Sequence, residues 1–212
     1  MKKGFLNIIL YLFFPAIITS LFYTLLNVNN ITYFIFTTTP YLLLCYYFIY
    51  NYKNIFIDDF KKINKKNLLI TIGIWLLGFI LMIFANYIIN YIIFDNAISS
   101  NEEINRNLLI NHKITYSLLM CIIIPFLEEV SFRLEFKKNI KNNIVFILLS
   151  STIFGLIHLI NITSIIELVY FIPYFILGLT FSFIFKKTDS IYMNIFAHML
   201  HNTICVIIIL FL

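Results

Sequence analysis

The chain alternates long apolar runs with short polar segments, and this pattern predicts helices that cross a membrane. A spanning α-helix needs about 20 mainly apolar residues. Seven runs of roughly this length can be marked, at residues 5–26, 31–50, 68–94, 114–136, 144–160, 165–185 and 191–212. The fifth is the shortest of them, and Pro15 is expected to kink the first. The pattern therefore predicts an all-α, polytopic membrane helical bundle of about seven transmembrane helices.

Two longer polar segments separate these runs. Residues 51–67 carry five lysines, and their few apolar side chains share one helical face, which predicts a short basic helix in the membrane interface. Residues 95–112 are predicted to form a polar loop. We therefore expect residues 1–112 to hold the first three spans and the basic segment. Residues 113–212 then hold the last four spans, within the same structural domain.

Composition agrees with a membrane protein. Of the 212 residues, 61% are hydrophobic and 12% are charged, and the mean hydropathy is +0.94. Soluble domains have about 45–50% apolar and about 25% charged residues. The bias towards Asn, Ile, Lys, Phe and Tyr is typical of an AT-rich genome. We therefore expect a multi-pass protein in the cell membrane of a low-GC Gram-positive bacterium.

The distribution of positive charge predicts the orientation. A net charge of +5 and a pI of about 9.0 could indicate nucleic-acid binding. However, with the amino terminus in the cytoplasm, 13 of the 15 Lys and Arg residues lie in cytoplasmic segments, and only Arg106 and Lys113 lie outside. This is the positive-inside pattern of membrane proteins. It favours a cytoplasmic amino terminus and the lipid bilayer, rather than nucleic acid, as the partner.

A few polar side chains lie deep inside the predicted spans. They are Glu128, Glu129 and Arg133 in the fourth span, His158 in the fifth, and His198 and Asn202 in the seventh. At a rise of about 1.5 Å per residue, these groups fall within a band roughly 10 Å thick near the middle of the bilayer. A charge in hydrocarbon costs at least about 2.5 kcal/mol, so such residues face one another and mark functional sites. We therefore expect them to converge.

Helix geometry gives the two neighbouring carboxylates different roles. Glu129 and Arg133 are four residues apart, so they share a helix face and can pair. Glu128 lies about 100° round the helix and lacks that partner. A carboxylate without a counter-charge in a water-poor site is suited to act as a general base. The pattern therefore predicts one structural and one reactive glutamate.

Two further features bear on this site. Pro125 is expected to leave the carbonyl of Cys121 without its helical donor, and the resulting kink would admit water. In the seventh span, His198 and Asn202 are four residues apart and share a face. Both side chains can donate hydrogen bonds to an oxyanion that develops during hydrolysis.

Together these motifs resemble one family of membrane enzymes. The chain has EE-x-x-x-R at residues 128–133, F-x-x-x-H at 154–158 and H-x-x-x-N at 198–202. Their order and approximate spacing resemble those of the CPBP family, the CAAX proteases and bacteriocin-processing (Abi) intramembrane endopeptidases. The resemblance covers about residues 114–212. It implies a hydrolase that cleaves a membrane-associated or lipidated peptide, in bacteriocin or peptide-signal maturation or in bacteriocin immunity.

The resemblance also implies a role for each motif residue. Glu128 and His158 would activate water, His198 and Asn202 would form the oxyanion hole, and Glu129, Arg133 and Phe154 would support the site. The alternative is a metalloprotease in which Glu128, Glu129, His158 and His198 bind zinc. The lack of an H-E-x-x-H motif and the arginine partner of one glutamate favour the glutamate mechanism, without a cofactor.

Two other functions are compatible with the same residues. The chain could be a catalytically silent immunity or scaffold protein with this fold, which would tolerate the loss of Glu128. It could also be a proton-coupled transporter that uses the carboxylates as a relay. The transporter is less favoured because the sequence lacks the paired, glycine-broken helices that are common in such proteins.

Overall fold

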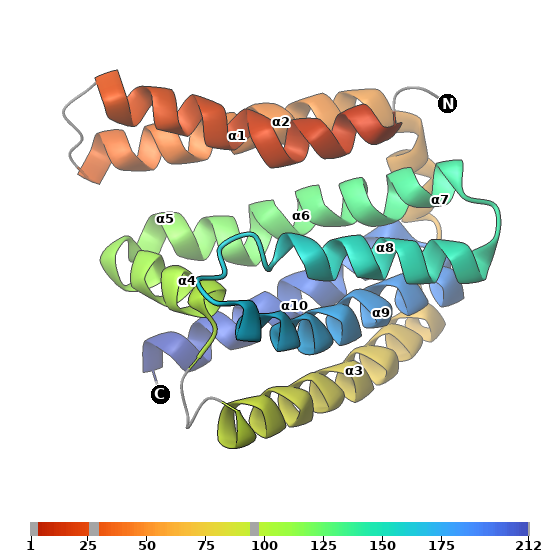
Figure 1. Ribbon diagram of the computed structural model, residues 1–212. Coiled ribbons are helices and arrows are strands. Elements are labelled where there is room, and N and C mark those ends of the chain that lie inside the picture. The colour runs from red at the N-terminus through yellow and green to blue at the C-terminus, as the bar shows by residue number, and fades with distance from the viewer. Residues whose placement is uncertain (1–3, 26–29, 94–97, 212) are drawn as a thin grey trace.

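The computed structural model describes residues 4–25, 30–93 and 98–211, and every regular element in these ranges is a helix. α1 (Gly4–Leu25) and α2 (Asn30–Phe60) run side by side along one edge of the bundle, and α3 (Lys65–Ile92) lies at the opposite edge (Figure 1). Between them come α4 (Ser100–Asn111), a continuous helical run from Lys113 to Asn139, α8 (Asn143–Ile157), the 3-10 helix η3 (Ile165–Tyr170), α9 (Phe171–Thr188) and α10 (Ile191–Phe211).

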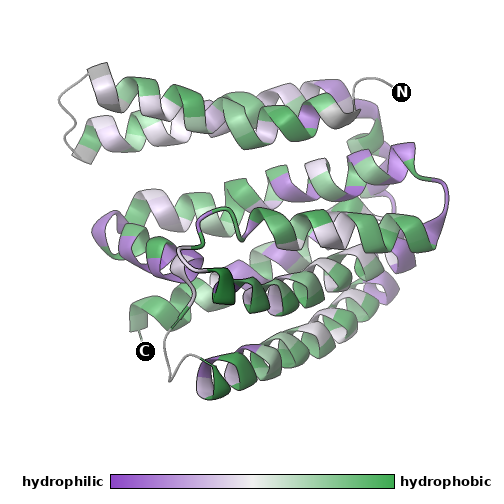
Figure 2. Cartoon of the chain, viewed as in Figure 1, coloured by the Kyte–Doolittle hydropathy of each residue, from purple (hydrophilic) through white to green (hydrophobic). Residues whose placement is uncertain are grey.

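The apolar helices correspond to the seven predicted runs. Within the described ranges, five helical segments are long and apolar enough to cross a membrane: Ile31–Phe60, Lys65–Ile92, Lys113–Asn139, Ile165–Thr188 and Ile191–Phe211. Two more apolar helices, Leu6–Phe22 and Asn143–Ile157, are shorter. Figure 2 shows apolar residues along the helices and hydrophilic residues gathered towards the two ends of the bundle. The predicted all-α, polytopic membrane fold is confirmed.

The basic segment at residues 51–67 does not form the separate interfacial helix predicted for it. Residues 51–60 extend α2 to a length of 31 residues, since neither glycine nor proline interrupts them. The chain turns at residues 61–64, where the side chain of Asn64 accepts a hydrogen bond of 2.9 Å from the backbone N–H of Asn67. This contact caps the start of α3, so the basic residues straddle two long helices.

The predicted polar loop at residues 95–112 contains the helix α4. Ser99 caps this helix by accepting a 3.2 Å hydrogen bond from the backbone N–H of Glu102. Arg106 then pairs with Glu102 one turn later, at 2.6 Å. The Ser-x-x-Glu start and the i,i+4 ion pair stabilise a polar helix that hydrophobic periodicity alone does not reveal.

Two glycines allow α9 to pack closely against its neighbours. A Cβ atom added to Gly78 of α3 would lie 1.9 Å from Oγ1 of Thr180 on α9. A Cβ added to Gly178 of α9 would lie 2.9 Å from the backbone of Ser151 on α8. Small residues let membrane helices approach each other closely in this way. The contact fixes α8 and α9, which both carry residues of the site described below.

The helical run from Lys113 to Asn139 contains two π-helical stretches. Its parts are α5 (Lys113–Leu118), η1 (Leu119–Ile123), α6 (Ile124–Glu129), η2 (Val130–Leu134) and α7 (Glu135–Asn139). At the end of each stretch a backbone N–H donates to the carbonyl five residues earlier, instead of four as in an α-helix. These bonds run from Ile124 to Leu119 and from Glu135 to Val130. Such π-helical turns often occur at functional sites. Here they bracket α6, which carries both glutamates.

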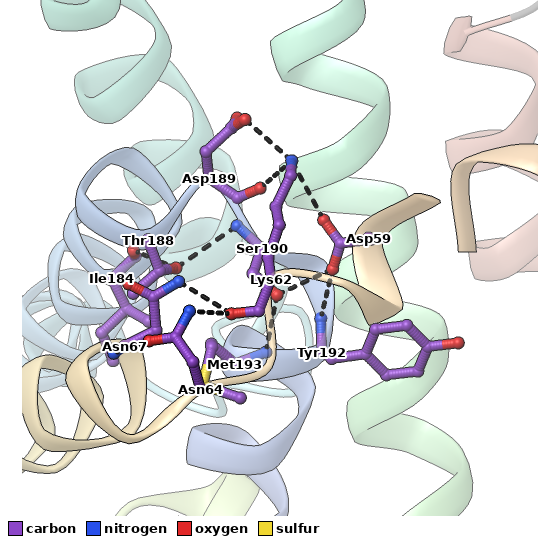
Figure 3. A network of polar contacts seen from close by, with 10 residues as sticks. All are labelled: Asp59, Lys62, Asn64, Asn67, Ile184, Thr188, Asp189, Ser190, Tyr192 and Met193. Atoms are coloured by element: carbon purple, nitrogen blue, oxygen red, sulfur yellow. Dashed lines mark hydrogen bonds and ion pairs between the residues drawn. The ribbon is translucent and has the colours of Figure 1, made fainter. Parts of the chain in front are cut away.

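A polar network ties the end of α2 to the start of α10 (Figure 3). Asp59 is buried, and its Oδ2 accepts hydrogen bonds from the Ser190 hydroxyl at 2.7 Å and the Tyr192 backbone N–H at 3.2 Å. Nζ of Lys62 lies 3.3 Å from Oδ1 of Asp59 and 2.8 Å from Oδ2 of Asp189. A carboxylate at a helix start satisfies N–H groups that have no intrahelical partner. The network therefore sets the position of α10.

Candidate active site

The two glutamates of α6 lie at the centre of the bundle. Glu128 is 5% exposed and Glu129 is fully buried. Residues from α1, α8, α9 and α10 surround them, so segments far apart in the sequence meet at this point. Burial of two neighbouring carboxyl groups is costly unless each finds partners. Their partners therefore define the site.

Glu129 is held by three side chains. Nδ1 of His198 lies 2.8 Å from its Oε1, and the side-chain amide of Asn194 donates a hydrogen bond to its Oε2. Nε of Arg133 lies 3.3 Å from the same Oε2. The predicted pairing of Glu129 with Arg133 is therefore confirmed. Both oxygens of Glu129 are engaged, and this carboxylate fastens α6 to α10.

Arg133 extends this cluster to α8. Its side chain is fully buried, and Nη1 donates a 2.7 Å hydrogen bond to the hydroxyl of Ser150. That hydroxyl donates in turn to the backbone carbonyl of Phe132, at 2.6 Å. The guanidinium carbon lies 4.9 Å from the centre of the Phe154 ring, which is cation–π distance. Arginine, carboxylate and ring together join α8 to the rest of the site.

Glu128 has a different environment. Its Oε1 accepts a 2.6 Å hydrogen bond from the hydroxyl of Tyr11, which belongs to α1. Its Oε2 lies 3.7 Å from Nε2 of His198, beyond direct hydrogen-bond distance. Arg133 pairs with the neighbouring glutamate instead. Glu128 is therefore the carboxylate of the pair that has an oxygen left for a further polar group.

His198 lies between the two carboxylates. Nδ1 is directed at Glu129 and Nε2 at Glu128. Its ring stacks on Phe181 with the ring centres 4.4 Å apart, and Phe154 meets it edge-on at 5.9 Å. These two rings fix the plane of the imidazole. With Nδ1 donating to Glu129, Nε2 carries a hydrogen only when the ring is protonated.

His158 ends α8 beside this cluster. Its Nδ1 lies 2.8 Å from the backbone carbonyl of Phe154, one turn earlier, so that nitrogen is the donor. The ring stacks on Tyr174 with the ring centres 4.5 Å apart. His158 is within electrostatic range of Glu128 and His198. In the neutral ring Nε2 is therefore an acceptor.

Asn202 reaches a backbone group of η1. Its side-chain amide donates a 2.8 Å hydrogen bond to the carbonyl of Met120. In the π-helical register this carbonyl would bond to the N–H of residue 125, which is a proline and has none. Pro125 therefore leaves the carbonyl of Met120 without a helical donor in this register. Asn202 supplies the missing donor.

Sequence reasoning missed three contributors to this site. Asn194 lies one turn before His198 and shares its face, so the spacing N-x-x-x-H carried a signal for it. Ser150 gave no signal, because serine is common in apolar helices as a local hydrogen-bonding group. Tyr11 gave none either, because it lies in a helix without a recognisable motif and is 117 residues from its partner.

The four residues considered as zinc ligands do not form a ligand set in this arrangement. Among the described residues, no three His, Cys, Asp or Glu side chains are grouped so that they could hold a metal ion. Both oxygens of Glu129 are committed to protein partners, and Nδ1 of His158 is committed to a carbonyl. We therefore derive no step through a metal.

Comparisons with known proteins agree with the motifs. Residues 110–204, just under half of the chain, match the family model described as type II CAAX prenyl endopeptidase Rce1-like. A protein of Bacillus subtilis (strain 168) named "Putative membrane peptidase YdiL" is 37% identical over 89 residues, which cover 41% of this chain and 34% of that protein. The matched part thus spans about a third of that relative. No solved structure matches the chain significantly. All three motifs lie within residues 110–204, so these comparisons support the resemblance of this part of the chain to the CAAX-protease and bacteriocin-processing family.

Proposed function

We propose that the protein is an intramembrane endopeptidase that hydrolyses a peptide bond of a membrane-associated or lipidated peptide. The observation that carries this proposal is the contrast between the two glutamates. Glu129 is saturated by protein partners, whereas Glu128 has Oε2 directed towards the Nε2 atom of His198 without contacting it. A buried carboxylate with a vacant acceptor beside imidazoles is an arrangement that can bind and activate water. The family of residues 110–204 supports the same reaction.

In this mechanism Glu128 is the general base and His158 assists it. A water molecule between Oε2 of Glu128 and Nε2 of His158 gives a proton to the carboxylate, and its oxygen attacks the peptide carbonyl carbon. The protonated Glu128 then transfers that proton to the nitrogen of the leaving amine, which breaks the C–N bond. The products are a carboxylic acid and an amine, and no group outside the protein and water is needed.

His198 and Asn202 are proposed to stabilise the oxyanion of the tetrahedral intermediate. His198 does so as the protonated ring, with Nδ1–H donating to Glu129 and Nε2–H donating to the oxyanion. One N–H of Asn202 is used by Met120, so the second N–H of the same amide is the proposed oxyanion donor. Glu129, Arg133 and Phe154 keep these groups in place.

An apolar groove supports a substrate with a hydrocarbon or apolar chain. It has a volume of about 950 Å³ and runs between α2, the start of α3, α6 and α10. Phe126, two residues before Glu128, lines it, and so do Ile195 and Met199, which flank His198 on α10. The groove thus passes along the outer side of the helices that carry the site. A lipid group or apolar side chain bound there would bring an attached peptide close to Glu128.

The test is peptide cleavage by the purified protein in proteoliposomes. The probes are a fluorescence-quenched farnesylated peptide with a CAAX end and the same peptide without the lipid. We expect cleavage by the wild-type protein, and loss of at least about a hundredfold in Glu128→Gln, which keeps the shape but not the base. Equal cleavage by both proteins would remove Glu128 from the mechanism.

The proposed physiological role is maturation of bacteriocins or peptide signals, or self-immunity to bacteriocins. A non-enzymatic immunity protein of the same fold would need the shape of the site but not its base. Cells that produce Glu128→Gln should therefore lose processing or protection if the role is enzymatic. Full protection by this variant would favour the non-enzymatic role.

A further inference from the structure

The carboxylate proposed as the base is contacted by a helix outside the family-matched region. The hydroxyl of Tyr11 in α1 donates a 2.6 Å hydrogen bond to Oε1 of Glu128, whereas the family match begins at residue 110. A hydroxyl bonded to a carboxylate forms one of the stronger types of protein hydrogen bond. The amino-terminal helices therefore contribute directly to the surroundings of Glu128.

Two further contacts hold Tyr11 in this position. Its ring packs edge-on against Phe132, with the ring centres 5.7 Å apart, on the same helical run as Glu128. One turn earlier on the same face of α1, the buried amide of Asn7 donates a 2.5 Å hydrogen bond to the hydroxyl of Tyr52 on α2. Asn7 thus fixes α1 against α2, and α1 in turn presents Tyr11 to Glu128.

We propose that Tyr11 is a positioning residue for Glu128: its hydroxyl holds Oε1, turns Oε2 towards His198 and stabilises the ionised carboxylate. This inference rests on the proposed endopeptidase function. A general base must be ionised before it can accept a proton from water. A donor on Oε1 favours the ionised form and leaves Oε2 as the reactive oxygen. The first helices thus complete a site whose recognisable motifs all lie in the second half of the chain.

The pH dependence of catalysis gives a readout that simple loss of packing would not change. The ionisable groups around Glu128 are Glu129 and Arg133 on its own helical run, Tyr11 on α1, Tyr41 on α2, His158 on α8 and His198 on α10. Tyr11→Phe removes one hydroxyl and leaves all the other groups in place. A change in the acid limb of the pH profile therefore reports the bond between Tyr11 and Glu128.

The experiment compares kcat/KM against pH for wild type, Tyr11→Phe and Tyr170→Phe in proteoliposomes, with the farnesylated peptide as substrate. Tyr170→Phe is the matched control, since it loses an interhelical hydroxyl bond of the same length, the 2.6 Å bond from Tyr170 to Asn90 on α3, and takes no part in the contacts that hold Tyr11 or Glu128. We expect Tyr11→Phe to lower kcat/KM about tenfold at neutral pH, mainly through kcat. We also expect its acid limb to move about one unit to higher pH, while Tyr170→Phe keeps the wild-type profile.

Labelling of Glu128 by dicyclohexylcarbodiimide, which reacts with protonated carboxyl groups in membranes, gives a second measurement that does not depend on turnover. Mass spectrometry should show several-fold faster labelling in Tyr11→Phe than in wild type or Tyr170→Phe. An unchanged pH profile and labelling rate in Tyr11→Phe, with Glu128→Gln inactive, would overturn the role of Tyr11 alone. Full activity of Glu128→Gln would instead overturn the proposed function and, with it, the positioning role.

Discussion

Nδ1 of His198 lies 2.8 Å from Oε1 of Glu129, so the histidine predicted to bind an oxyanion is fastened to the glutamate predicted to be structural. This contact joins α6 to α10, and Arg133 on the other oxygen joins the same carboxylate to α8. Glu129 is therefore more than the partner of one arginine. It is the point at which the three motif-bearing helices meet.

Replacing Glu129 by glutamine should destabilise the protein strongly. The amide leaves the buried guanidinium of Arg133 without its counter-charge, which costs about 3 kcal/mol or more. Thermal unfolding in detergent should show a clear drop in the midpoint. The double variant Glu129→Gln/Arg133→Met removes both charges and should recover part of the loss. A single variant as stable as wild type would mean that this ion pair does not hold the helices together.

The close approach of α8 and α9 can be tested at one glycine. In Gly178→Ala the new methyl group meets the backbone of Ser151 at 2.9 Å, so the helices must separate, at a cost of about 1–3 kcal/mol. Gly73→Ala is the matched control, because a Cβ there meets no atom within 4 Å and alanine is the better helix former. Equal unfolding midpoints for the two variants would argue against the tight crossing.

The residues that form the site could be predicted from the sequence more fully than the contacts between them. Six residues of the predicted spans carry polar groups that are costly to leave in lipid, so the spans had to turn these faces inward. They are Glu128, Glu129, Arg133, His158, His198 and Asn202. Their depths within the predicted spans followed from the lengths of the apolar runs and the distribution of lysines. The convergence of His198 with both carboxylates is the physical outcome of that cost.

Other features depended on interactions that a periodic pattern does not contain. The two π-helical stretches shift the hydrogen-bond register, so the N–H that Pro125 lacks would have faced the carbonyl of Met120. α4 is polar, and its cap and ion pair stabilise it instead of an apolar face. Tyr11 is one of 14 tyrosines in the chain, and only the packing of α1 distinguishes it from the rest.

The hydrogen bond from Asn202 to Met120 allows the structural and the catalytic role of Asn202 to be tested separately. Asn202→Ala should leave a carbonyl unsatisfied and cost about 1–3 kcal/mol of stability. Adding Pro125→Ala gives residue 125 an N–H in the register that faces this carbonyl, so the double variant should regain stability. If Asn202 also serves the oxyanion, the double variant should remain at least about tenfold slower in peptide cleavage. Recovery of both stability and activity would limit Asn202 to its structural role.

The polar network at the start of α10 predicts that the folded state becomes less stable at high pH. Burial lowers the pKa of Lys62, but the hydrogen bonds and charges of Asp189 and Asp59 outweigh it and raise that pKa above its ordinary value. A raised pKa in the folded state gives a stability contribution that is complete at neutral pH and is lost as the pH rises through the folded value. The side chain of Lys62 is 39% exposed, so the contribution is below about 1 kcal/mol.

The midpoint temperature of thermal unfolding should therefore fall slightly more between neutral and strongly alkaline pH for wild type than for Lys62→Met. Lys61→Met is the control, because Lys61 pairs with the exposed Asp58 and does not reach α10. The two substitutions remove the same charge at neighbouring positions. Identical curves for both variants would mean that the bridge to Asp189 contributes nothing.

Catalysis by Glu128 without a metal should survive chelation. The four residues that could be considered as zinc ligands include Glu129, whose oxygens already bind His198, Asn194 and Arg133. Recruiting it to a metal would break the ion pair that joins the helices, at a cost of several kcal/mol. Peptide cleavage by protein treated with 1,10-phenanthroline should therefore match that of untreated protein, with a known zinc protease as the positive control for chelation. Loss of cleavage that added zinc restores would require His158, His198 and the glutamates to rearrange around a metal, and would replace the general-base mechanism proposed for Glu128.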